Sequence, residues 1–252
     1  MNTIIENYNL QIKKFQKIES GTSDNEIYEK GVILERIFPI LRISKINASQ
    51  VKNGEKAIKL FGKLRDIQVQ QLKLESIDQT LEIKEYSTFL EERELDLKEK
   101  VHKFFKNKVL EFPTIKKKSR LNKAKVIDRT EKSLKKLIEK IQSKSIDDVE
   151  DLLEIKIKFE KFHYRVEILS YLVKIEDANL EMLNMYQDKL GDIQEYEVLI
   201  KGIRKYFKKH KLEAEEVTEI FEGEQNSLIE NFDNGIEIFI AFCREVICLN
   251  KQ

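Results

Sequence analysis

The chain has 252 residues, of which 46 are lysine or arginine and 45 are aspartate or glutamate, so the formal net charge is only +1. With 36% charged and 41% hydrophobic residues but only 8 Gly, 2 Pro and no Trp, the composition is typical of long amphipathic helices and disfavours a disordered chain. The balance of charge excludes a global field that would draw the protein onto nucleic acid or a membrane. Any site for a polyanion therefore has to be local.

Apolar residues recur at three- and four-residue spacing in eight stretches, which predicts eight helices. These cover about 2–19, 25–45, 50–75, 78–111, 120–142, 146–174, 177–210 and 213–248. Pro39 should kink the second helix, because proline has no N–H to donate. No run of alternating β-branched residues predicts a strand. The predicted fold class is all-α.

Pro113 and the basic run that follows it mark the best candidate boundary, because a helix breaker is joined there to a charge run. Four predicted helices lie on each side. We therefore expect one domain over residues 1–252, made of two tandem, pseudo-symmetric four-helix units at 1–112 and 113–252.

The third helix of each predicted unit contains the same phrase. It reads FGKLRDIQV at 61–69 and LGDIQEYEV at 190–198, and both segments fit apolar, Gly, any, aliphatic, any, acid, any, any, Val. Glycine inside a helix costs about 1 kcal/mol relative to alanine. Gly62 and Gly191 at matching positions therefore predict a place where another helix backbone approaches closely.

The repeated phrase resembles the Leu-Gly-Asp-Leu-x-Asp-x-x-Val signature of the CHAD (conserved histidine α-helical domain) family. Just upstream, LEIKIKFEKFHY at 153–164 resembles the basic family helix His-x-x-Arg-x-x-x-Lys-Arg-x-Arg-Tyr, with Lys156, Lys161 and Tyr164 matching. The sequence departs from this pattern in both halves: Leu153 and Tyr28 stand at the histidine positions, and bases are replaced by Glu160, His163, Gly31 and Glu35. The resemblance is to a diverged member without the namesake histidines.

The resemblance implies a non-enzymatic module that binds inorganic polyphosphate or a similar polyanion in a basic channel between the two halves. The candidate lining consists of Arg36, Arg42, Lys59, Lys63, Lys156, Lys161, Tyr164 and Arg165. Two alternatives stay open: these cations are ordinary solvated charges, and Tyr164 is an amphipathic core residue. On that interpretation the protein is a diverged helical scaffold or interaction domain that has lost the ligand.

A metal-carboxylate site is a further alternative. Glu99 with His102 and Glu160 with His163 form two Glu-x-x-His pairs on predicted helices, as in ferritin-like bundles. No matching pair of inward glutamates can be identified, so we expect no metal and no cofactor. The sequence contains no phosphate-binding glycine loop and no nucleophile elbow, and we expect no catalytic residue.

The remaining features concern the cell compartment and nucleic acid. Cys243 and Cys248 provide neither a disulfide framework nor a zinc site, and the N-terminus lacks the features of a signal peptide. We therefore expect a cytoplasmic protein without membrane insertion. The basic segment 116–125 lacks interleaved aromatic residues, so it predicts a solubilising linker rather than specific nucleic-acid recognition. The sequence does not predict the oligomeric state.

Overall fold

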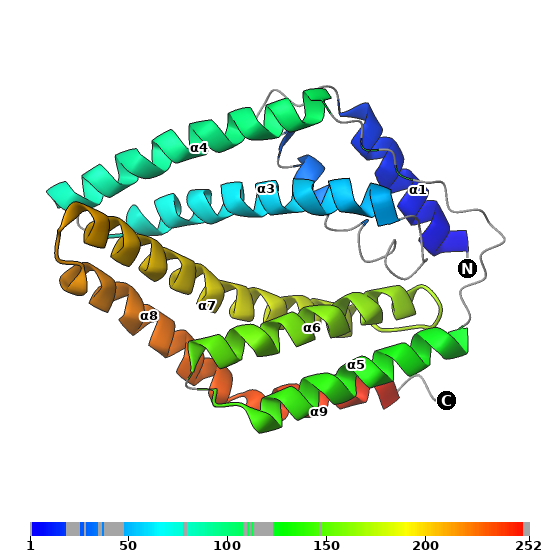
Figure 1. Ribbon diagram of the computed structural model, residues 1–252. Coiled ribbons are helices and arrows are strands. Elements are labelled where there is room, and N and C mark those ends of the chain that lie inside the picture. The colour runs from blue at the N-terminus through cyan, green and yellow to red at the C-terminus, as the bar shows by residue number, and fades with distance from the viewer. Residues whose placement is uncertain are drawn as a thin grey trace. The chain divides into compact units, whose positions relative to one another are not determined.

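The computed structural model consists mainly of helices (Figure 1). It describes residues 2–18, 26–27, 29–34, 37, 48–77, 80–107, 110, 112, 123–146 and 148–248. The helices are α1 (Asn2–Lys17), α3 (Ala48–Leu74), α4 (Leu81–Asn107), α5 (Lys123–Ser143), α6 (Val149–Ser170), α7 (Asp177–His210), α8 (Glu215–Asp233) and α9 (Ile236–Cys248). No strand occurs within these described residues, and the all-α prediction is confirmed.

The chain divides into two compact units, Met1–Leu121 and Asn122–Gln252. This boundary comes later in the chain than the predicted break at Pro113, which itself lies outside the described residues. In the predicted second helix, residues 26–27, 29–34 and 37 are helical where they are described, while Pro39 and its expected kink lie outside.

The first unit has an aromatic core around a buried lysine. The ring of Phe105 lies 6.1 Å from that of Phe15 and 5.7 Å from that of Phe61. Lys30 is only 5% exposed, and its Nζ lies 4.9 Å from the centre of the Phe105 ring. The cation is therefore held against the negative faces of aromatic rings rather than in water.

The core of the second unit is centred on α6 and completed by α9. Phe159 of α6 and Phe239 of α9 are fully buried, with ring centres 5.1 Å apart, and Tyr186 of α7 lies 4.4 Å from Phe239. Burying a side chain of this size contributes about 1.5–3 kcal/mol. The last helix of the chain thus contributes directly to the centre of this unit.

The predicted eighth helix is two helices, α8 and α9. The amide of Gly235 donates to the carbonyl of Phe232, 3.1 Å away and only three residues back, and the amide of Phe239 then donates to Gly235 at 2.9 Å. One helix therefore ends in a tight turn at Asn234 and Gly235, and a new helix begins after it. The prediction of one continuous helix is wrong. The apolar periodicity continues through the break, which is why the pattern hides it.

The prediction of close backbone approach at Gly62 and Gly191 is also wrong. Among the described residues, a Cβ atom built at either position would meet nothing within 4 Å beyond its neighbours and its own helix backbone. Both glycines are half-buried on sides of α3 and α7 that have open space. The repeated phrase is therefore not explained by helix–helix contact at its glycines.

Candidate functional site

The candidate lysines of the first unit lie together on α3. Lys59 and Lys63 are exposed and one helical turn apart, so they share a face of the helix. Neither forms an ion pair with a described residue. Arg36 and Arg42, the other two candidates in this unit, lie outside the described residues.

Lys156 of the second unit is already neutralised within α6. Its ammonium forms an ion pair with Glu160, one turn further on, and the two side chains are only 15% and 30% exposed. Glu160 stands where the CHAD pattern has a base, so this departure from the pattern supplies the counter-ion for Lys156. Lys161 lies five residues from Lys156, well around the helix, and is exposed. The structure therefore does not bring Lys156 and Lys161 onto one face.

His163 and Tyr164 belong to the helix packing. His163 is 3% exposed, and its Nδ1 contacts Oε1 of Gln187 on α7. Its Nε2 is buried and has no hydrogen-bond partner among the residues that the structure describes. Tyr164 is half-buried, with its ring centre 6.1 Å from that of His163.

Arg165 joins α6 to α5. Its Nη1 donates to the main-chain carbonyl of Arg129 at 2.7 Å. Burial lowers the pKa of Arg165, and the nearby positive charge of Arg129 lowers it further. Two guanidinium groups thus lie in the same region of the α5–α6 surface, and Arg129 forms no ion pair with a described residue.

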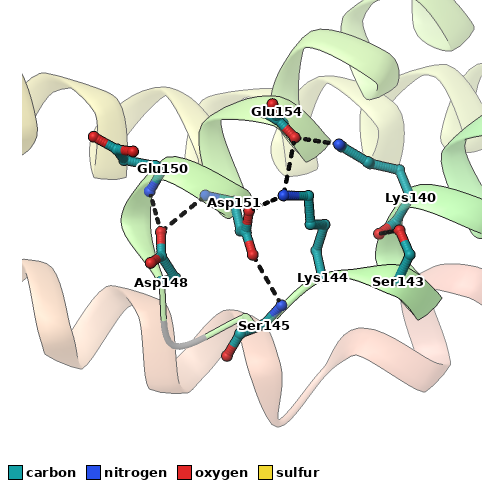
Figure 2. A network of polar contacts seen from close by, with 8 residues as sticks. All are labelled: Lys140, Ser143, Lys144, Ser145, Asp148, Glu150, Asp151 and Glu154. Carbon is teal, nitrogen blue, oxygen red and sulfur yellow. Dashed lines mark hydrogen bonds and ion pairs between the residues drawn. The ribbon is translucent and has the colours of Figure 1, made fainter.

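At the opposite end of the two helices, carboxylates of α6 bind lysines of α5 and of the turn (Figure 2). Lys140 pairs with Glu154, while Lys144 pairs with Asp151 and lies 3.4 Å from Glu154. These contacts lower the pKa of Asp151 and of Glu154, mainly through the hydrogen bonds from Lys144 and Lys140, respectively. The hydrogen bond to Asp151 likewise raises the pKa of Lys144.

Asp148 begins α6 by capping it. Its side chain accepts hydrogen bonds from the amides of Glu150 at 2.7 Å and Asp151 at 3.0 Å (Figure 2). Such a cap stabilises a helix by about 1 kcal/mol, because it satisfies amides that have no partner within the helix. The helix predicted over 146–174 therefore begins close to the observed start at Val149.

The two end contacts fix the register of the whole α5–α6 seam. Arg129 and Lys140 lie about three turns apart on α5, and their partners Arg165 and Glu154 lie the same distance apart on α6. Positions along this stretch at four- and seven-residue spacing face the same seam. They place Lys136 opposite Lys158, and Ser133 opposite Lys161.

From this register, the seam carries positive side chains and the neutral Ser133, and no acidic residue, between its two end contacts. We call these positive side chains the cation strip, which consists of Arg129, Lys136, Lys158, Lys161 and Arg165. Of these residues, Arg129, Lys136, Lys158 and Lys161 form no ion pair with any residue that the structure describes. Like charges that face each other across a seam repel, and a bound anion would relieve that repulsion.

Sequence reasoning identified Lys161 and Arg165 but missed Arg129, Lys136 and Lys158. The missing information was the pairing of α5 with α6. A signal was present, because bases recur at matching spacings, 129 and 136 on one helix and 158, 161 and 165 on the other. That spacing becomes meaningful only when the two helices are known to be antiparallel neighbours.

The metal alternative finds no donor set in the described part of the chain. No three His, Cys, Asp or Glu side chains gather there as a metal ion would require. Glu160 binds Lys156, and His163 turns its Nδ1 to Gln187.

None of the helices in the described ranges is long and apolar enough to span a membrane.

Comparison with solved structures identifies the fold. The chain matches the crystal structure of the CHAD domain from the plant Ricinus communis with a TM-score of 0.62 and 12% sequence identity, over 96% of this chain and 89% of that chain. No protein-family model matches the sequence, and no curated protein matches it. The chain is an all-α protein with the CHAD-domain fold, and at this identity the likeness establishes the fold alone. The resemblance inferred from the repeated phrase is confirmed at that level.

Proposed function

We propose that this protein is a non-enzymatic module that binds inorganic polyphosphate or a similar linear polyanion. The observation that carries the proposal is the cation strip, in which four side chains that form no ion pair with a described residue follow one seam of the second unit. The CHAD-type fold supports it, because the resemblance implies a basic polyphosphate-binding channel between the two halves. The strip makes the proposal testable within a single unit.

A row of cations suits a linear polyanion better than a single phosphate. From Arg129 to Lys136 the rise of α5 is about 10 Å, so one small anion cannot contact both ends of the strip. A chain of phosphates can contact several cations at once and release its condensed counterions, as nucleic-acid backbones do. The expected mechanism is electrostatic capture without any bond being made or broken.

Titration with long-chain polyphosphate by calorimetry at low and moderate salt tests the proposal directly. We expect binding that weakens steeply with salt, with a slope of about −0.7 in log K against log salt for each phosphate contact. The double variant Lys136→Gln with Lys158→Gln should reduce this slope by about 1.4 and weaken binding roughly fivefold or more at low salt.

The matched control is Lys84→Gln with Lys103→Gln on α4. Both residues are exposed and form no ion pair with a described residue, so the change in net charge is the same. Equal losses in the two double variants would show a general charge effect and contradict the strip as the site. No binding by the unsubstituted protein at low salt would contradict the proposed function itself.

A second candidate function is favoured by the Lys156–Glu160 pair. An acid in place of a family base, paired with a motif lysine, is what a scaffold that had lost its ligand would carry. The same titration separates the two functions. Folded protein that does not bind polyphosphate would favour a helical scaffold or protein-interaction domain.

A further inference from the structure

The cation strip does not end at Lys136, because two more lysines continue it in a neutralised form. Lys140 lies one turn beyond Lys136 on the same side of α5, and Lys144 lies one turn further along the chain. Both are bound by Glu154, and Lys144 also by Asp151 (Figure 2). The row of positive side chains is thus longer than its unpaired part.

The carboxylates that hold these lysines are differently anchored. Asp151 also accepts a hydrogen bond from the amide of Ser145 at 3.2 Å, so it has a second role in the turn. Glu154 is 50% exposed, and the two lysines are its only polar contacts in the described residues. Ion pairs on a partly exposed surface add little net stability, so an incoming polyanion can displace Glu154.

We propose that Glu154, assisted by Asp151, is a built-in competitor that reserves Lys140 and Lys144 for long polyanions. This inference rests on the proposed function, since it concerns the same seam. The carboxylates occupy the places that phosphate groups would take. The two lysines are therefore a latent extension of the binding surface, and Glu154 is a determinant of chain-length preference.

The geometry gives this preference a physical reason. The unpaired part of the strip on α5 spans about 10 Å from Arg129 to Lys136, whereas the distance to Lys144 is about 22 Å at 1.5 Å per residue. A short anion is satisfied by the unpaired cations and leaves Glu154 in place. A long chain reaches both lysines and gains two further contacts once it displaces the carboxylates.

The test is Glu154→Gln, titrated with long-chain polyphosphate and with tripolyphosphate. We expect the variant to bind the long chain roughly threefold to fivefold more tightly, because one competing carboxylate has been removed. Tripolyphosphate should gain less. The control Glu219→Gln removes the same charge from α8, where the side chain is exposed and forms no ion pair with a described residue, and it should leave both affinities unchanged.

A mutant cycle identifies the lysines as the source of the gain. In a background carrying Lys140→Gln and Lys144→Gln, the substitution Glu154→Gln should no longer tighten binding. Persistence of the gain in that background, an equal gain in Glu219→Gln, or no gain at all would overturn the inference while leaving polyphosphate binding intact. If neither the unsubstituted protein nor Glu154→Gln binds the long chain, the proposed function fails, and this inference fails with it.

Discussion

Arg165 of α6 donates its Nη1 hydrogen bond to the main-chain carbonyl of Arg129, not to a side chain. The bond that joins the two helices therefore does not need the guanidinium group of Arg129. That group is held beside another positive charge without an ion-pair partner among the described residues. Structure and binding can accordingly be separated at these two positions.

Substitution of Arg129 should affect binding, and substitution of Arg165 should affect both binding and stability. Arg129→Gln keeps the accepting carbonyl and removes a like charge, so we expect weaker polyphosphate binding with an unchanged or slightly higher free energy of unfolding. Arg165→Gln removes the interhelix hydrogen bond and should lower the free energy of unfolding by about 0.5–1.5 kcal/mol. Urea unfolding and calorimetry on the same preparations check both. Equal destabilisation by the two variants would contradict this division of roles.

Lys30 should make the stability of the protein depend on pH. Burial lowers its pKa in the folded state, and the nearby Glu26 opposes part of that shift. Between this lowered pKa and the ordinary value of 10.5, the unfolded chain binds more protons than the folded chain, so stability rises as pH increases through that window. Lys30→Met keeps the apolar stem and should flatten the rise.

The measurement is urea unfolding between pH 7 and about 9.5, below the ordinary pKa of tyrosine near 10. The upper limit matters because burial raises the pKa of Tyr8 and Tyr86, which makes stability fall at higher pH. A rise of the same size in Lys30→Met and in the unsubstituted protein would exclude Lys30 as its cause.

His163→Phe should leave the protein folded and at least as stable. The substitution removes a buried Nε2 that has no hydrogen-bond partner in the described part of the chain. It keeps an aromatic ring beside Phe159, while the half-buried Gln187 can turn to water. His163→Ala, by contrast, removes the ring and should cost about 2–4 kcal/mol through loss of packing. Thermal unfolding distinguishes the two. Destabilisation by Phe as large as that by Ala would show that the ring nitrogens carry the contribution.

The same pair of variants tests where binding takes place. His163 lies about half a turn around α6 from the side that carries Lys158, Lys161 and Arg165. Polyphosphate affinity should therefore be unchanged in His163→Phe. A large loss of affinity in a folded variant would place the ligand on the α6–α7 side instead.

Much of the fold could be predicted because helix ends have chemical signatures. The helix predicted over 146–174 begins close to Asp148, which caps α6 in the structure. The break at Asn234 and Gly235 was missed although an Asn-Gly dipeptide is a turn signal, because the apolar pattern runs through it. Gly62 and Gly191 led to a wrong prediction of close helix contact, because a glycine can lower the stability of a helix without another helix packing against it.

The candidate site was predictable only in part. A motif describes residues that are close in sequence, whereas the cation strip is formed by two different helices. Lys161 and Arg165 were identified on the basic helix itself. Arg129 and Lys136 belong to a helix without any motif, and their relevance depends on the register set by the end contacts of the seam. Lys156 fits the motif in sequence, yet its charge is neutralised by an ion pair with Glu160.

The packing of α9 ties the end of the chain to the beginning of the second unit. α9 contacts α5, the first helix of that unit, and places the fully buried ring of Phe239 between α6 and α7. During synthesis, α5 to α8 are made before α9, the helix that completes their core. The second unit can therefore reach its native packing only after translation has passed the break at Gly235, and a premature stop there would leave an open, aggregation-prone core.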